Sequence, residues 1–596
     1  MPNRSARHTK TPGHIPGLAE PVSLRLPAAL ETLRNNTLDL HKNDGPYWEP
    51  EPAAISAIAQ AWHAHGQHED RQLWCARRFA IRLATLPLNL EPGETIVGKP
   101  LVRTFADHEM AEIERVGAEI ADLPSCPGGD TGHFHPNYET VLRLGVRGLL
   151  DSIASRRAAT DDDATTPFYD ACERAMGGFQ AYIRRVADAC LTRADHSPDD
   201  AADWRELAAI SGRLATEPPA TFHEACQLMY FVLIASWVGE GHGMTCYGRM
   251  DRTLTPFYEA DIAAGCTTPQ RAMELIAALF IQLNRICPIG LADAVMVGGR
   301  DSAGQDTTNT LTYLCLAARR ATQLRNPSVG IAWHAGTPDE LMTFAMEMLA
   351  TGIGCPAFFN DETIAPGLRD HGVSLADSHN YMNSTCVEIK PVGASNIWVA
   401  TEYVNCPKVL LEVMRRETVG ECPPAEDVDE LQHRLREIIA QKVANTATQL
   451  DDLWRHRAAT WAMPFASCLV DDCLERGLDH DRGGCRYNWA ENSFVGLANL
   501  ADGLVAIDEL VYRTGEMTLA EFYAICESNF DGHETLRQRI LNLPSYGNDD
   551  ERADTLASAW GDFLCSTTES CTVADHRYVP GFFCSQFHAW LGYDTG

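Results

Sequence analysis

The chain has little positive charge, no long apolar run, no Cys-x-x-Cys pair and no internal repeat. Of its 596 residues, 81 are acidic and 49 are basic, which gives a formal net charge of −32. A surface this acidic repels phosphate backbones, so the composition argues against nucleic-acid binding. The most apolar run, residues 228–238, is far shorter than the about 20 residues that a membrane-spanning helix needs. We therefore predict no membrane span.

The cysteines and the start of the chain indicate a reducing, cytoplasmic location. Residues 1–17 contain Arg, Lys, His and Pro but no apolar stretch, so they are not a secretory signal. In such a chain most of the 20 cysteines are expected to be small buried hydrophobes rather than disulfide partners. Without a Cys-x-x-Cys pair, zinc ribbons and most iron–sulfur patterns are excluded. His133 and His135 have no third ligand at suitable spacing, so we predict no metal site.

Helical periodicity dominates the chain, and short apolar stretches between the helices predict buried strands. The expected helices are 52–84, 204–214, 222–238, 268–286, 338–351, 426–453, 505–512, 519–530 and 549–564. The expected strands are 95–97, 294–297, 328–332, 357–359 and 494–497. Helices that alternate with short buried strands predict an α/β fold. Because no loop has the length or composition of a linker, we predict a flexible tail over residues 1–20 and one large domain over 21–596.

The most unusual segment surrounds Cys386. Small polar residues precede this cysteine, and Pro391 and Gly393 follow it, which predicts an exposed loop or turn. In an extended backbone, residues i and i+2 project to the same side, so Cys386 and Glu388 would face one pocket. A sulfur atom and a carboxylate placed together suit hydrogen transfer and general base catalysis. With 20 cysteines and 81 acidic residues, however, a single Cys-x-Glu pattern also arises by chance.

A series of short motifs supports a functional role for the Cys-x-Glu pattern at Cys386 and Glu388. They are Leu90–Gly98, Gly132-His133 with Pro136–Tyr138, Glu217–Ala225, Gly248–Asp251, the Cys386 loop, Asn405–Lys408, Ala501–Ile507 and Tyr546–Asp550. In this order, along nearly the whole chain, they resemble the glycyl radical enzymes of the pyruvate formate-lyase family.

This resemblance implies a ten-stranded α/β barrel of two five-stranded halves, surrounded by helices, with the Cys386 loop inside it. It implies that Cys386 becomes a thiyl radical and removes a hydrogen atom from a small-molecule substrate. No cofactor would bind directly, because a separate S-adenosylmethionine iron–sulfur activase installs the radical on a backbone glycine. A barrel interior suits such chemistry, since radicals must be kept from water and oxygen. The resemblance also implies an oxygen-sensitive cytoplasmic homodimer.

The residues around Cys386 indicate the branch of the family. Pyruvate formate-lyases carry two adjacent cysteines here, whereas this chain has Thr385 before Cys386, which disfavours acyl transfer. The resemblance to the eliminating branch assigns Glu388 as the general base that deprotonates a substrate hydroxyl. His133 and His242 are similar to two histidines that line the diol dehydratase pocket, so we expect both to bind substrate.

The sequence departs from the family pattern at two places. Ala400 stands where diol dehydratases have an aspartate, which weakens an assignment to glycerol or propanediol. The radical motif Arg-Val-x-Gly-Tyr is not found, and we reject Arg577–Phe583 as its equivalent because Pro580 would restrict the loop. We therefore expect the chain to be C-terminally incomplete as a radical enzyme. The radical glycine would lie in a longer protein or on a separate glycyl radical subunit, or the chain would be an inactive remnant.

These observations predict a glycyl-radical-dependent lyase of the dehydratase type, which performs a 1,2-elimination on a small hydroxylated substrate. One alternative is a radical decarboxylase or another C–C lyase of the same family. The other is a non-catalytic barrel that binds a small molecule or a partner subunit.

Overall fold

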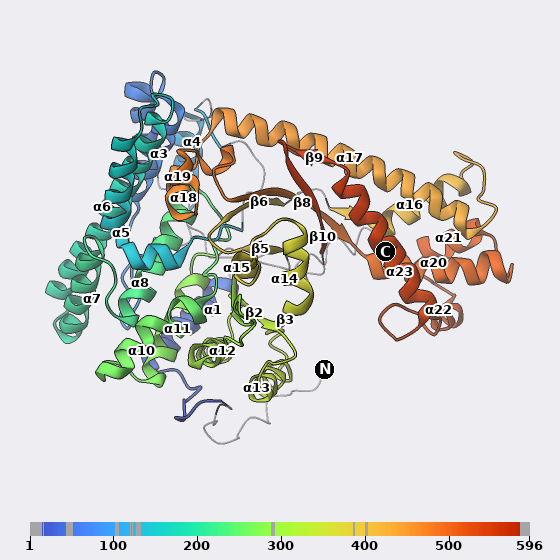
Figure 1. The fold of residues 1–596 in the computed structure, drawn as a ribbon, viewed down its shortest axis with the longest axis horizontal. Helices are drawn as coiled ribbons and strands as arrows, with labels where there is room; N and C mark the ends of the chain where they lie inside the picture. The colour runs from blue at the N-terminus through green and yellow to red at the C-terminus, as the bar shows by residue number, and fades with distance from the viewer. Residues whose placement is uncertain are drawn as a thin grey trace. The chain divides into compact units, whose positions relative to one another are not determined.

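The computed structural model describes residues 15, 17–42, 52–101, 106–119, 121, 123–126, 133–287, 293–384, 388–399 and 403–583. Backbone contacts divide them into two compact units (Figure 1). The first contains the described residues of Met1–Cys126, Gly132–Asn396 and Thr460–Tyr487. The second contains those of Ile397–Ala459 and Asn488–Gly596. Within the described ranges, none of the helices has the length and apolar character that crossing a membrane requires.

The first unit is mostly helical. Its α-helices are α1 (Ala28–Lys42), α2 (Pro52–Ala61), α3 (Arg71–Thr85), α4 (Asp107–Glu119), α5 (Tyr138–Ala159), α6 (Thr166–His196), α7 (Ala201–Leu214), α8 (Phe222–Ile234), α9 (Met250–Thr253), α10 (Thr255–Ala264), α11 (Pro269–Asn284), α12 (Thr310–Thr322), α13 (Asp339–Leu349), α14 (Asp361–Asp370), α15 (Leu375–Ser378), α18 (Pro464–Leu469) and α19 (Cys473–Arg476). The 3₁₀ and π segments are η1 (Trp62–Gly66), η2 (Pro198–Asp200), η3 (Ala235–Glu240) and η4 (His480–Arg482). Helices α3, α5 and α6 lie side by side, and α18 packs against all three (Figure 1).

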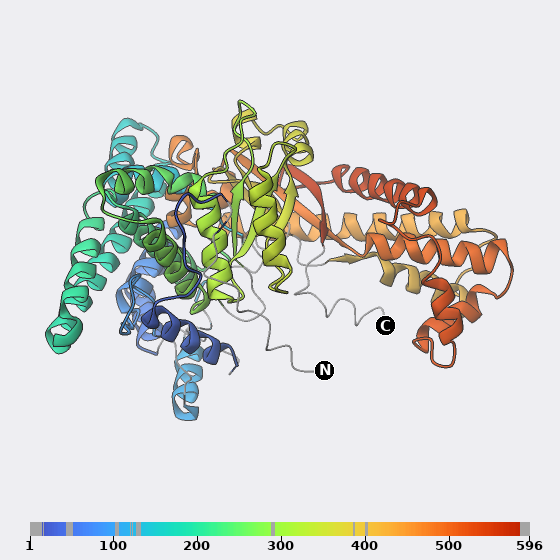
Figure 2. The same cartoon turned by 90° about the horizontal axis from the view of Figure 1, so that it is seen from below.

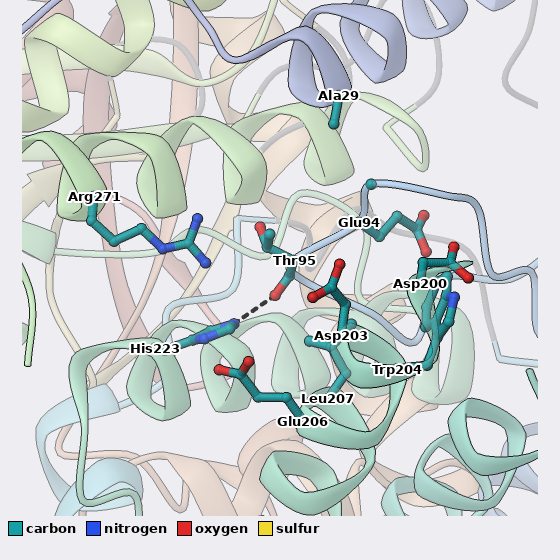
Figure 3. Close-up of a pocket in the computed structure, with 11 residues that line it drawn as sticks. Ala29, Glu94, Thr95, Asp200, Asp203, Trp204, Glu206, Leu207, His223 and Arg271 are labelled. Atoms are coloured by element: carbon teal, nitrogen blue, oxygen red, sulfur yellow. Dashed lines mark hydrogen bonds between the residues drawn. The ribbon is translucent and has the colours of Figure 1, made fainter. Parts of the chain in front are cut away.

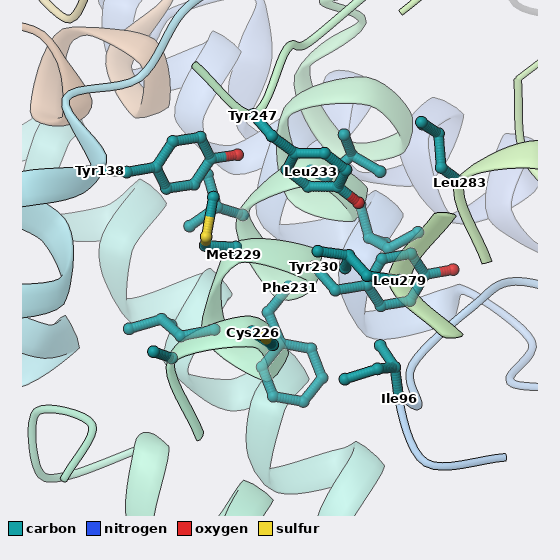
Figure 4. Close-up of a cluster of buried hydrophobic side chains, with 14 of the residues drawn as sticks. Ile96, Tyr138, Cys226, Met229, Tyr230, Phe231, Leu233, Tyr247, Leu279 and Leu283 are labelled. Atoms are coloured by element: carbon teal, nitrogen blue, oxygen red, sulfur yellow. The ribbon is translucent and has the colours of Figure 1, made fainter. Parts of the chain in front are cut away.

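Helix α8 lies in the hydrophobic core of this unit. Thr221 and Glu224 close a capping box at its start, which satisfies backbone N–H groups that would otherwise lack partners. Every side chain from Ala225 to Ile234 is buried, as expected for a helix that is apolar on all sides. Figure 4 shows Tyr230, Phe231 and their neighbours in this cluster. The most apolar run of the sequence is therefore a core helix.

Two small sheets in the same unit carry the segments that matter for function. Strands β1 (Ala294–Gly298), β2 (Ser328–Trp333) and β3 (Ala357–Asn360) run parallel in the order β1-β2-β3. The continuous burial of β1 is typical of a strand covered on both faces. Strands β4 (Tyr381–Asn383) and β5 (Ile389–Pro391) form an antiparallel hairpin, with Met382 opposite Lys390.

The second unit combines a sheet with long helices. Its strands β6 (Ser395–Val399), β7 (Val404–Asn405), β8 (Tyr487–Val495), β9 (Thr572–Val573) and β10 (His576–Phe583) pair in the order β6-β8-β10-β9, with β7 also beside β8. Its helices are α16 (Cys406–Thr418), α17 (Val428–Thr460), α20 (Leu497–Ile507), α21 (Leu519–Glu527), α22 (Glu534–Ile540) and α23 (Glu551–Glu569), with the π segment η5 (Asp508–Arg513). Helix α17 is the long orange helix in Figures 1 and 2. Its Trp454 stacks on Trp398 of β6, with ring centroids 4.7 Å apart.

The α/β class and most of the predicted elements are confirmed, with three corrections. The helix predicted over 52–84 is interrupted, because η1 and a turn separate α2 from α3. Residues 95–97 form no strand, and the chain there makes only an isolated bridge between Leu88 and Pro100. The strand predicted over 494–497 is wrong at its end, since β8 stops at Val495 and α20 begins at Leu497.

The strands of the described residues form three separate sheets. Closure of a ten-stranded barrel therefore stays a prediction, as do the domain boundaries. The segment Arg577–Phe583, which we rejected as a radical loop, lies in β10 and pairs with β8.

Candidate active site

The predicted catalytic loop lies at the tip of the β4–β5 hairpin. The Ser384 N–H donates to the Glu388 carbonyl over 2.6 Å, which brings the two ends of the loop together. Cys386 lies between them in sequence but outside the described residues. Ser384 and Glu388 are buried, with 0% and 3% exposure, so the flanks of the loop are not exposed as we predicted. The reason is tertiary packing, because His133 and Cys246 lie against a segment whose composition is typical of a surface turn.

One family motif fixes the hairpin against β1. Arg249 donates to the carbonyl oxygen of Tyr381 over 3.0 Å and also to that of Gly298. The Asp251 carboxylate accepts from the Gly298 N–H over 2.7 Å and from the Thr312 hydroxyl over 2.8 Å. The Gly248–Asp251 motif thus connects β4, the end of β1 and α12 through hydrogen bonds, and it fixes the first strand of the hairpin.

A second motif contacts the other end of the hairpin. Asn137 caps α5 by accepting from the Thr140 N–H, and its amide donates to Asp471 over 2.7 Å. Gly393 has φ +66°, and a Cβ there would lie 2.5 Å from the Cβ of Asn137. Only glycine allows this approach, because there is no room for a Cβ and the backbone is in the left-handed region.

The structure brings His133 and Glu388 together. The His133 Nδ1 atom lies 3.7 Å from Glu388 Oε2 and forms a hydrogen bond with the Ser384 hydroxyl. The ammonium group of Lys390 donates to the His133 carbonyl over 3.1 Å. His133 also has φ 72°, a conformation that costs a residue with a Cβ about 1–2 kcal/mol. Such strain is common where a side chain is held for function.

His242 reaches the same region through Phe134. Its ring stacks on that of Phe134 with centroids 4.6 Å apart, and Phe134 directly follows His133. The backbone of Cys246 donates to the Phe134 carbonyl over 2.9 Å. The thiol of Cys246 donates to the Ser384 carbonyl over 3.6 Å. The loop between η3 and α9 is therefore packed against both the His133 segment and the catalytic hairpin.

Burial sets the charge of several groups around this site. It raises the pKa of Glu240 to about 8, although that carboxylate accepts from the Phe465 and Ala466 N–H groups. Burial, with Lys390 nearby, holds the pKa of His135 well below its ordinary value, so His135 is neutral. Burial alone would lower the pKa of His480, but Cys485 and Asp481 outweigh it and raise that pKa to about 10.

The sequence reasoning missed several of these residues. Ser384 and Lys390 flank the loop, yet nothing in their residue type distinguished them from ordinary turn residues. His480, whose ring meets that of His242 edge-on with centroids 5.5 Å apart, stands between Asp479 and Asp481 in the sequence. A histidine between two acids was the one signal available, since neighbouring carboxylates favour the imidazolium.

The described residues offer no metal site, and one of their surface pockets lies away from the predicted site residues. No group of three or more His, Cys, Asp or Glu side chains in them could hold a metal ion. A cavity of about 270 Å³ lies elsewhere in the first unit (Figure 3). It is lined by Ala29, Gly93, Glu94, Thr95, Asp200, Asp203, Trp204, Glu206, Leu207, His223 and Arg271. No predicted site residue lines it, so we assign it no role in the proposed reaction.

A solved structure matches this fold over almost the whole length of the chain. It is the glycerol-bound form of the B12-independent glycerol dehydratase from Clostridium butyricum, with a TM-score of 0.86 and 22% sequence identity. The match covers 96% of this chain and 82% of that chain. At this identity, the comparison establishes the fold alone.

Sequence comparison places the chain in a family. Residues 109–592 match the family described as pyruvate formate lyase-like, and the chain belongs to that family. It is 26% identical over 545 residues to a (2S)-3-sulfopropanediol dehydratase of Klebsiella oxytoca, which covers 84% of this chain. It is 29% identical over 443 residues to a trans-4-hydroxy-L-proline dehydratase of Clostridioides difficile, which covers 69% of this chain. The matches span 65% and 55% of those two relatives, which is less than two thirds of their length.

Proposed function

We propose that this chain is the substrate-binding, thiol-bearing part of a glycyl radical lyase of the dehydratase type. Its substrate would be a small molecule with a hydroxyl group next to a carbon that carries a leaving group. The observation that supports this most directly is the pairing of Glu388 with His133 at 3.7 Å, where both side chains are buried and Glu388 lies two positions after Cys386 in the sequence. Membership of the family and the two dehydratase relatives support the same reaction class.

The proposed roles follow from the chemistry of each side chain. The sulfur of Cys386, once oxidised to a thiyl radical, takes a hydrogen atom from the carbon that bears the hydroxyl. The Glu388 carboxylate accepts the hydroxyl proton, which assists departure of the leaving group from the neighbouring carbon. The proton on Glu388 passes to the leaving group, and the hydrogen atom returns from the Cys386 thiol to the product radical, so the protein ends the cycle unchanged. In a dehydration, the products are a carbonyl compound and water.

His133 and His242 would orient the substrate. His133 is held by Ser384 and by its strained backbone, which leaves little freedom to its ring. His242 is held by its stack on Phe134. Rings held in this way lose little entropy when they bind a substrate hydroxyl, which favours a defined geometry for elimination. Ala400 and the two residues that follow it, which bear on substrate choice, lie outside the described residues.

The source of the radical is part of the proposal. A backbone glycine would carry it, and a separate S-adenosylmethionine iron–sulfur activase would install it. The glycine would lie either in the same protein or on a second subunit, and the assembly would be a homodimer. The intact mass of the native protein, purified without oxygen together with any chain that accompanies it, identifies which chain carries this glycine.

The test is a single substitution in the anaerobically activated native assembly. Cys386→Ser removes the hydrogen-abstracting sulfur but keeps the size of the side chain, so turnover should fall to background while substrate binding persists. Cys315→Ala, at a fully buried thiol in α12, is the matched control and should keep turnover. Full turnover in Cys386→Ser would overturn the thiyl assignment. Binding without turnover in the activated wild type would favour the non-catalytic alternative.

Product analysis separates the two catalytic alternatives. An eliminase releases water or another leaving group and keeps the carbon skeleton, whereas a decarboxylase releases carbon dioxide. Release of carbon dioxide with loss of one carbon would show that the reaction is a decarboxylation and not an elimination. Cys386 would keep its role in both cases, which makes the product and the Cys386→Ser result independent tests.

A further inference from the structure

Two thiols that the proposed reaction does not use lie next to each other in the first unit. The sulfur atoms of Cys473 and Cys485 are 3.7 Å apart, and both residues are fully buried. They are 12 positions apart in the sequence, so a loop returns the chain to its starting point. A disulfide needs a sulfur–sulfur distance of about 2 Å, which side-chain rotation of two neighbouring thiols can supply.

The backbone between Cys473 and Cys485 folds back on itself and brings the two cysteines together. Cys473 begins α19, and the chain returns through Gly477 and Gly483, which have φ +64° and +81°. The Arg476 guanidinium donates to the carbonyl oxygen of Cys485 over 2.8 Å, which holds the end of the loop. A Cβ at Gly484 would lie 2.1 Å from the carbonyl oxygen of Leu478, so the return is too tight for any larger residue.

The two sulfurs have different charges. Burial raises the pKa of Cys473 well above its ordinary value, so Cys473 is a thiol. Burial would do the same to Cys485, but the hydrogen bond from Cys473 and the positive charge of His480 lower its pKa to about 6. His480 is held by Asp481, with 3.0 Å between Nδ1 and Oδ1. A thiolate beside a thiol is the arrangement in which one sulfur attacks and the other resolves.

We propose that Cys473 and Cys485 are a redox-active dithiol, which hydrogen peroxide converts into an intramolecular disulfide. The Cys485 thiolate attacks one peroxide oxygen, the O–O bond breaks, and the departing hydroxide takes up a proton to become water. Cys485 is now a sulfenic acid. The Cys473 sulfur attacks it, the Cys473 proton leaves with the sulfenic hydroxyl as a second water, and the S–S bond forms. The two thiols lose two electrons and peroxide gains them.

The consequence would reach the predicted substrate pocket. The ring of His480 lies with its centroid 5.5 Å from that of His242 and 5.7 Å from that of Phe134. Oxidation removes the negative sulfur that stabilises the His480 imidazolium, so the charge beside His242 changes. This dithiol does not depend on the proposed function, because its formation can be measured without turnover.

The first experiment maps disulfides in the full chain. The reduced protein is treated with hydrogen peroxide at pH 7, alkylated, digested and analysed by mass spectrometry. We expect one cross-linked peptide pair that joins Cys473 to Cys485, reversed by dithiothreitol. In Cys473→Ser, dimedone should trap a sulfenic acid at Cys485, and in Cys485→Ser, Cys473 should stay a reduced thiol. The proposal is overturned if the folded wild-type protein forms no such pair.

A second thiol pair provides the control. The Cys468 thiol donates to the carbonyl oxygen of Cys172 in the same region, and Cys172 is a thiol because burial raises its pKa. Cys468→Ser should therefore leave the Cys473–Cys485 disulfide unchanged. Preferential oxidation of Cys172 and Cys468 in the wild type would show that proximity of buried sulfurs, and not the thiolate, selects the pair, and would overturn the proposal.

The role of His480 has its own readout. In His480→Gln the thiolate absorbance assigned to Cys485, obtained by subtracting the Cys485→Ser spectrum, should move from near pH 6 to well above pH 8. Oxidation at pH 7 should slow by several-fold only, since a more basic thiolate is a better nucleophile. Circular dichroism checks that the His480→Gln protein keeps its fold. An unchanged thiolate titration in the folded variant would contradict the assignment.

Discussion

Glu388 and His133 are the residues on which the proposed elimination most directly depends. They come from segments far apart in the sequence: His133 and Ser384, which share a hydrogen bond, are 251 positions apart. Both side chains are withdrawn from water. A carboxylate and an imidazole in such a setting interact more strongly than they would in water, because the local dielectric is low. Their pairing gives two residue-scale tests.

Glu388→Gln should lower kcat by about 10²- to 10⁴-fold, which is the usual contribution of a general base. Glutamine keeps the shape of the side chain, so KM should change little. The measurement is steady-state turnover of the activated assembly, with exposed Glu139→Gln in α5 as the control. Full turnover in Glu388→Gln would show that another group accepts the proton.

His133 combines a proposed contact to substrate with a strained backbone. Two variants separate the effect of the contact from that of the strain. Asparagine tolerates the left-handed region, so His133→Asn should keep the thermal midpoint of the wild type while KM rises at least about tenfold, the cost of one lost hydrogen bond. His133→Val should also lose about 1–3 kcal/mol of unfolding free energy, since a β-branched residue is strained at φ 72°. Equal stability of the two variants would contradict the strain argument.

At the scale of elements, the β4–β5 hairpin is positioned by contacts at both ends. Arg249 holds Tyr381 at the start of the hairpin. Gly393 lies against Asn137, the residue that caps α5, just after the hairpin. The motifs that carry the family resemblance therefore have structural roles here, since they fix the hairpin to its neighbours.

Gly393→Ala should destabilise the protein by about 1–3 kcal/mol, because the new methyl group meets Asn137 and the backbone has positive φ. Gly212→Ala in α7 is the matched control. A Cβ there meets nothing within 4 Å, so this helix should gain about 0.5–1 kcal/mol. Guanidinium unfolding curves measure both changes. A stability of Gly393→Ala equal to that of the wild type would mean that the hairpin can move away from α5.

At the scale of the whole molecule, buried carboxyl groups make stability depend on pH. Burial raises the pKa of Glu240 from 4.5 to about 8 in the folded state. Between these values the folded state binds more protons than the unfolded state, so stability falls as pH rises. This pH dependence is opposite in sign to that of a carboxylate in a salt bridge, whose contribution to the stability of the protein is lost as pH falls.

Glu240→Gln should flatten the decrease in stability between pH 5 and pH 8. The substitution removes the titrating group, although it also weakens one of the hydrogen bonds to the start of α18. The absolute stability at pH 5 should therefore be lower than in the wild type, while the slope against pH becomes smaller. Denaturant unfolding at several pH values measures the slope. An unchanged slope would show that Glu240 is not the group responsible.

The sequence by itself determined the features that depend on local pattern. Helical periodicity located α7, α11 and α13 to within a few residues, since the apolar stripe of a helix is written in consecutive positions. The ordered motifs also indicated the family and singled out Cys386 and Glu388. The same reasoning joined α2 and α3 into one helix, because the turn that separates them interrupts the pattern only briefly.

Only the tertiary structure decided which distant residues meet. Periodicity reports whether a side chain is buried, but it does not report its partner. The pairing of His133 with Glu388 and the stack of His242 on Phe134 depend on how the helices and the hairpin pack. The same packing places His480 beside His242, and a tight glycine-containing loop returns Cys485 to Cys473. Long-range contacts are set by the whole fold, which is why no local pattern could have predicted these partners.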